Sequence, residues 1–109
     1  MRWDRRRGLW LGLALTFAAT PLLAQSVEVG IRDYKYDPPT LQIRPGTTVK
    51  WTNLEKRVSH SILFKGPGGF ESERIFPGES WQRTFDRPGT YLYTCGPHPE
   101  MFGQIEVGE

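Results

Sequence analysis

Residues 26–53 read SVEVGIRDYKYDPPTLQIRPGTTVKWTN, and the alternation of apolar and polar residues in this stretch decides the fold. Val27, Val29 and Ile31 alternate with polar or small residues, which is the pattern of a half-buried β-strand. The alternation resumes twice before the stretch ends, and prolines and a Pro-Gly pair separate the segments. The apolar residues change parity after Ile31, so we expect a bulge or turn near residues 32–33.

The rest of the chain is divided in the same way. Further strands are expected at 58–64, 81–85, 90–95 and 104–107, with an irregular loop at 65–76 that contains proline and glycine. No segment keeps the 3.6-residue period of an amphipathic helix. Roughly seven short strands with such turns predict an all-β, antiparallel sandwich in a single domain.

The first 24 residues have the composition of an export signal. Four arginines form a basic head, residues 8–19 are an apolar run without a charge, and Ala24 supplies a small residue before a cleavage point. An uncleaved anchor is the competing interpretation, but a spanning helix needs about 20 apolar residues, and Pro21 interrupts the run. We therefore expect residues 1–24 to be a signal peptide and residues 25–109 to be a periplasmic domain that does not span a membrane.

Most of the positive charge of the chain lies in this signal. The whole chain has a formal net charge of +2, whereas residues 25–109 hold 10 basic and 11 acidic side chains and have a net charge of −1. Such a domain lacks the basic surface that nucleic acid or an anionic membrane attracts. We therefore expect neither as a partner.

A thiol, an imidazole and a thioether follow one another at three-residue intervals near the C-terminus. They are Cys95, His98 and Met101, and His98 has a proline on each side. The only other histidine is His60, on an expected strand, and Cys95 is the only cysteine, so the chain has no internal disulfide. Two imidazoles, a thiolate and a weak axial thioether are the ligand set of a blue-copper site. We predict one mononuclear copper held by His60, Cys95, His98 and Met101, cycling between Cu(I) and Cu(II).

Other functions fit the same residues less well. Zinc sites rarely use a thioether, and multicopper enzymes need more histidines than the two in this chain. A Cys95–His98 nucleophile would lack a third, orienting residue, so we expect no enzymatic activity. A copper carrier without an electron-transfer role remains the alternative, although such carriers tend to be rich in methionine and this chain has two.

Two segments of the chain resemble the cupredoxins, the small blue-copper proteins of the plastocyanin, pseudoazurin and amicyanin types. They are residues 36–60 and the loop at 91–101, and the resemblance extends over residues 26–109. The short Cys-x2-His-x2-Met spacing is most similar to that of amicyanin. The resemblance implies a Greek-key β-sandwich of about seven to eight strands. It also implies one-electron transfer, with redox proteins such as a c-type cytochrome, a dehydrogenase or an oxidase docking on the monomer near the exposed edge of His98.

One position departs from the family pattern. Many cupredoxins have an asparagine after the first histidine ligand, where it connects the two ligand loops, and this chain has Ser61. The backbone N–H of Ser61 is still expected to donate to the sulfur of Cys95. Its shorter side chain puts the connection between the loops in question, and with it the tuning of the metal site.

Apolar residues surround the expected electron port. Pro97, Pro99 and Phe102, together with Pro67 and Phe70, form a candidate docking patch. The alternative is that Phe102 packs inward and the prolines only stiffen the loop. The sequence leaves both interpretations open.

Overall fold

The structure is a computed structural model that describes residues 25–109. The predicted signal peptide at 1–24 lies outside the described residues and stays a prediction. Within the described part the chain forms eight strands and no helix, so no helix there is suited to crossing a membrane. The strands are β1 (Ser26–Arg32), β2 (Lys35–Asp37), β3 (Thr40–Ile43), β4 (Thr47–Asn53), β5 (Leu63–Phe64), β6 (Ser80–Phe85), β7 (Gly89–Thr94) and β8 (Phe102–Val107).

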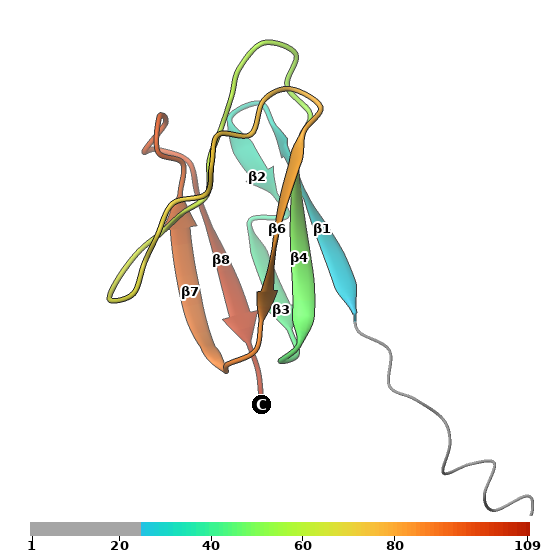
Figure 1. Cartoon of the computed structure of the whole chain (residues 1–109), viewed down its shortest axis with the longest axis vertical. Coiled ribbons are helices and arrows are strands. Elements are labelled where there is room, and N and C mark those ends of the chain that lie inside the picture. The colour runs from blue at the N-terminus through green and yellow to red at the C-terminus, as the bar shows by residue number, and fades with distance from the viewer. Residues whose placement is uncertain (1–24) are drawn as a thin grey trace, which may run out of the picture.

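The strands form two four-stranded sheets that face each other (Figure 1). One sheet has the order β2-β1-β4-β6, and the other has the order β3-β8-β7-β5. The predicted all-β sandwich is confirmed, but the expectation of a purely antiparallel one is wrong, because β1 pairs with β4 and β3 with β8 in parallel. The chain crosses to the second sheet between β2 and β3 and then returns, which places β4 beside β1 in the same direction.

The change of parity after Ile31 is explained by a tight turn. Asp33 and Tyr34 have φ angles of 54° and 58°, in the left-handed region, and they reverse the chain between β1 and β2. The two strands then pair so that Ile31 lies opposite Tyr36, and both side chains are buried. The turn predicted near residues 32–33 is therefore present, and it keeps one face of the sheet apolar.

An aromatic contact joins the two sheets at the centre of the core. Trp51 on β4 is fully buried, and its indole N–H donates to the hydroxyl of Tyr93 on β7 at 3.2 Å. The two rings meet edge to face, with centroids 5.5 Å apart, which is a favourable aromatic geometry. Burial raises the pKa of Tyr93 to about 12, although the hydrogen bond from Trp51 opposes this, so the phenol stays neutral.

His60 does not lie on a strand, contrary to the expectation for residues 58–64. Within residues 58–64 only β5 is a regular strand, and His60 forms an isolated β-bridge with Ile75. The cause is Asn53 at the end of β4, whose buried amide donates to the carbonyls of Val58 and Ile75 at 2.8 and 2.9 Å and turns the chain out of the sheet. The segment that follows β4 then runs to the end of the sandwich that lies away from the C-terminus, where the loop between β7 and β8 also lies (Figure 1).

We predict that Asn53→Ala lowers the free energy of unfolding by about 2–4 kcal/mol, because the buried carbonyl of Ile75 and the part-buried carbonyl of Val58 lose their donor. Urea denaturation of the metal-free protein measures the change. Thr52→Ala is the matched control: it removes an exposed side-chain hydrogen bond to Ser80 on the same strand and should cost less than about 1 kcal/mol. Equal losses in the two variants would contradict the role of Asn53.

Candidate metal centre

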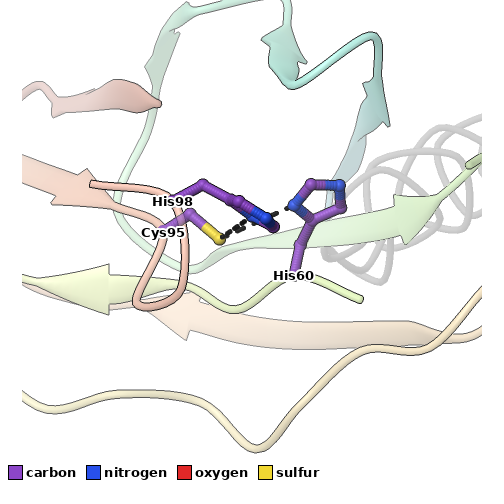
Figure 2. Close-up of side chains that lie close together, drawn as sticks. All are labelled: His60, Cys95 and His98. Carbon is purple, nitrogen blue, oxygen red and sulfur yellow. Dashed lines mark hydrogen bonds between the residues drawn. The ribbon is translucent and has the colours of Figure 1, made fainter. Parts of the chain in front are cut away.

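Three potential metal ligands converge at this end of the sandwich. Ligand atoms of His60, Cys95 and His98 all lie within 4.8 Å of one another. The Nδ1 atoms of both histidines lie 3.6 Å from the sulfur of Cys95. Figure 2 shows both imidazoles directed toward that sulfur. His60 comes from the bridge beside Ile75, and the other two come from the loop after β7.

The spacing of these atoms fits a metal ion. Bonds of ~2.1 Å to nitrogen and ~2.3 Å to sulfur separate the two donors by about 3.6–3.8 Å for tetrahedral to trigonal angles. The Cys95 sulfur lies 3.6 Å from each nitrogen, which matches this separation. A soft thiolate with two imidazoles also has the donor chemistry that suits copper. The residues therefore fit the metal that the sequence predicts.

His60 is oriented by a carboxylate that the sequence analysis missed. Its Nε2 lies 3.4 Å from Oε1 of Glu55, which leaves Nδ1 free to face Cys95, and the Glu55 side chain is only 15% exposed. Burial lowers the pKa of His60; the hydrogen bond that its ring donates to Glu55 opposes this shift, and His98 adds to it. The ring is therefore neutral at physiological pH, which is the form that binds a metal.

Glu55 is itself held in place from the backbone. The N–H of Tyr34 donates to its Oε1 at 3.1 Å. Burial raises the pKa of Glu55, but the hydrogen bonds from Tyr34 and His60 outweigh that effect and hold the pKa below its usual range. A glutamate five residues before a histidine on an irregular segment gave no sequence signal, because the contact depends on how that segment turns.

Tyr34 is a second neighbour that the sequence did not reveal. Its ring meets that of His98 edge to face at 4.8 Å and that of His60 at 5.7 Å. The left-handed turn places it there, and a non-glycine residue in that region costs about 1–3 kcal/mol. The aromatic ring therefore lies against both imidazoles while 44% of it stays exposed.

The sulfur of Cys95 is fully buried and accepts a hydrogen bond from the backbone N–H of Ser61 at 3.4 Å, as expected from the sequence. The carbonyl of Ser61 accepts a hydrogen bond from the hydroxyl of Tyr36 at 2.7 Å. Burial, and then the nearby charge of Cys95, raise the pKa of Tyr36, so its hydroxyl remains a donor. These contacts fix the peptide that faces the sulfur.

The ligand loops are also connected through the side chain of Ser61. Its hydroxyl accepts a hydrogen bond from the N–H of Gly96 at 2.9 Å. The two ligand loops are therefore connected, although this chain has Ser61 where many cupredoxins have asparagine. The shorter side chain suffices because the two loops lie close together at this point.

Met101 is buried beside the loop that carries Cys95 and His98. It is 2% exposed, and its backbone N–H donates to the carbonyl of His98 at 2.9 Å. Its own carbonyl accepts the N–H of Cys95 at 3.3 Å. The loop from 95 to 101 is thereby closed on itself, and the axial role of the Met101 sulfur stays a prediction.

Only part of the candidate docking patch lies on the loop of His98. Phe102 is 72% exposed, and Pro97 and Pro99 are exposed as well. The alternative in which Phe102 packs inward is therefore wrong. Next to the half-buried His98, the two exposed prolines of the loop leave apolar side chains open to contact.

The other two predicted members of the patch lie elsewhere: Phe70 packs on Phe64 with ring centroids 5.2 Å apart, and Pro67 lies beside Thr90–Leu92 on β7. The predicted patch of five residues is therefore wrong for Pro67 and Phe70.

Comparison with known proteins agrees with this geometry. Residues 23–108 match the sequence model of the copper-binding proteins of the plastocyanin/azurin family. The chain belongs to this family. Its cofactor is one type 1 copper, as the residue types predicted, and its fold is that of a cupredoxin.

The resemblance to amicyanin is confirmed as well. The cupredoxin chain is 39% identical over 88 residues to amicyanin-alpha of Methylorubrum extorquens, a match that covers 77% of this chain and 73% of the relative. It is 37% identical to the amicyanin of Paracoccus versutus over 94 residues, which covers 83% and 70% of the two chains. The structure of a reduced amicyanin mutant superposes with a TM-score of 0.72 at 30% identity, over 79% of this chain and 85% of the other.

A larger protein contains a similar fold. The copper-containing nitrite reductase of Thermus scotoductus matches 84% of this cupredoxin with a TM-score of 0.73 and 31% identity, but the match spans only 24% of the reductase. The similarity is therefore to one part of that protein.

The pKa of His60 predicts how the metal-free protein responds to pH. The folded state keeps this ring neutral, whereas the unfolded chain takes up a proton below about pH 6.5. The contribution of the neutral His60 ring to the free energy of unfolding should therefore be fully present above about pH 6.5. It should be lost as the pH drops from there toward the lower pKa of the folded state. Urea titrations of the metal-free protein at several pH values test this, and His60→Asn should have a shallower slope. Identical slopes would contradict the assignment.

Proposed function

We propose that this cupredoxin carries single electrons between redox proteins in the periplasm, with copper held by His60, Cys95, His98 and an axial Met101. The observation that carries the proposal is the convergence of two imidazole nitrogens on one buried sulfur at 3.6 Å. The bound copper supplies a one-electron couple.

The scaffold favours fast electron exchange. His60 is fixed by Glu55 and by its bridge to Ile75, and the sulfur of Cys95 is fixed by the N–H of Ser61. Ligands held by the protein before the metal binds change little between oxidation states, which keeps the reorganisation barrier low. The arrangement therefore serves a redox carrier better than a site that must exchange its metal readily.

His98 provides the route to a partner. It is the half-buried ligand, whereas His60 and Cys95 have no exposed surface. The exposed Pro97 and Pro99 on either side of it in the chain suit a transient contact with another redox protein, such as a c-type cytochrome, a dehydrogenase or an oxidase. Because a substrate could not reach the two buried ligands, we propose no catalytic role, and a monomer presents His98 directly.

Copper carriage without electron transfer is the second candidate function. It is compatible with the same ligands, since affinity alone does not distinguish storage from redox use. A reversible one-electron wave from copper that stays bound supports electron transfer. Release of copper on reduction supports carriage.

The thiolate ligand is tested by colour. Purified protein given Cu(II) should develop an intense visible band from charge transfer between the Cys95 sulfur and copper, and Cys95→Ser should abolish it. The neighbouring change Thr94→Ser on β7 is the control and should keep the band. A wild-type protein that binds one equivalent of copper and stays colourless would contradict the blue-copper proposal.

The axial ligand is tested by the reduction potential. Met101→Gln should keep copper bound but lower the potential, because a harder oxygen donor stabilises Cu(II) relative to Cu(I). Met101→Leu should raise it, because loss of a donor destabilises Cu(II) more. Voltammetry on both variants decides the matter, and two unchanged potentials would show that Met101 only packs the core.

A further inference from the structure

We propose that Glu71 is a positioning residue for the Cys95 ligand, that it acts through Ser61 and Gly96, and that its negative charge lowers the reduction potential of the site. This inference rests on the proposed copper function. It concerns a carboxylate that the ligand set does not include. The chain's departure from the usual asparagine at position 61 is what makes this carboxylate part of the site.

The hydrogen bonds around Ser61 have a fixed direction. The Ser61 side chain is fully buried, and its hydroxyl lies 2.6 Å from Oε2 of Glu71 and 2.9 Å from the N–H of Gly96. A hydroxyl has one proton, and an ionised carboxylate can only accept. The proton of Ser61 is therefore directed at Glu71, which leaves the oxygen lone pairs for the N–H of Gly96. The distance is that of a strong, charge-assisted hydrogen bond.

This arrangement controls the surroundings of the sulfur. The backbone N–H of Ser61 donates to the Cys95 sulfur at 3.4 Å, while the Ser61 hydroxyl takes the N–H of Gly96, the peptide directly after Cys95. The N–H of Gly96 is thereby paired with an oxygen and not with the sulfur. Hydrogen bonds to a ligating sulfur tune the potential of a copper site. Fixing the Ser61 rotamer therefore fixes how many donors the sulfur receives.

Gly96 lies directly against the carboxylate of Glu71. A Cβ atom there would overlap Oε2 of Glu71 and would lie 2.9 Å from the hydroxyl oxygen of Ser61. Gly96 is not among the residues with a positive φ, so its backbone conformation does not demand glycine. The absence of a side chain makes room for the carboxylate. Ser61, Glu71 and Gly96 therefore form one spatial unit.

The backbone of Glu71 is anchored to the segment that follows His60. Glu71 forms a bridge with Leu63, and the N–H of Ser72 donates to the carbonyl of Ile62 at 2.9 Å. The hydroxyl of Ser72 accepts the N–H of Ile62 at 2.9 Å in return. Glu71 is an exposed residue, but its backbone is anchored in this way and the end of its side chain is held by the hydroxyl of Ser61.

The charge has a separate effect from the hydrogen bond. A negative charge two hydrogen bonds from the sulfur stabilises the more positive oxidation state, Cu(II), and so lowers the reduction potential. Glu71→Gln removes the charge but keeps an oxygen that accepts from Ser61. Glu71→Ala removes both. The pair therefore separates electrostatics from positioning.

The experiment compares these two variants with Glu73→Gln, which removes an exposed charge two residues away on the same segment. Voltammetry of the copper form should show a higher potential for Glu71→Gln than for Glu73→Gln, with the blue band retained in both. In the metal-free protein, hydrogen exchange at the Gly96 amide should accelerate by about tenfold in Glu71→Ala, as for loss of one restraining hydrogen bond, and should stay near wild type in Glu71→Gln.

Two results would overturn the inference: equal potentials in Glu71→Gln and Glu73→Gln, or unchanged Gly96 exchange in Glu71→Ala. Both apply when the wild-type protein is blue. A wild-type protein that forms no blue centre overturns the proposed function instead. The metal-free exchange measurement still decides the positioning role of Glu71 in that case.

Discussion

The structure depends on the contact between two segments that are 35 residues apart in sequence, where the sulfur of Cys95 meets the Nδ1 atom of His60. The sulfur is fully buried, so the groups that face it must supply what water would otherwise supply. The N–H of Ser61 does so directly at 3.4 Å. A soft donor held between two imidazoles is then available to a metal that prefers neither a hard nor a fully soft environment.

The sandwich holds these segments together at one end. Asn53 turns the chain at the end of β4, and the Trp51–Tyr93 contact joins β4 to the strand that leads into Cys95. The position of one ligand loop relative to the other therefore depends on core packing between the sheets. Such a core is close-packed and resists deformation. The same rigidity that positions the ligands also limits their movement when an electron arrives.

Local patterns predicted the parts of the molecule that local chemistry determines. The strand period and the turn residues predicted the sandwich, and the spacing of Cys95, His98 and Met101 predicted copper. The parallel pairs β1–β4 and β3–β8 were missed, because alternation reveals a buried face but not the direction of its neighbour. Glu55 and Glu71 were missed because their contacts join residues through turns that carry no periodic signal.

The central claim is most directly tested by a crystal structure of the copper-loaded protein. Our account predicts one copper bonded to Nδ1 of His60, Nδ1 of His98 and the sulfur of Cys95, with the sulfur of Met101 at a longer distance. The loop from 95 to 101 should keep the backbone hydrogen bonds described above. Copper bound elsewhere, or a carboxylate such as Glu55 in place of the Cys95 sulfur, would contradict the account.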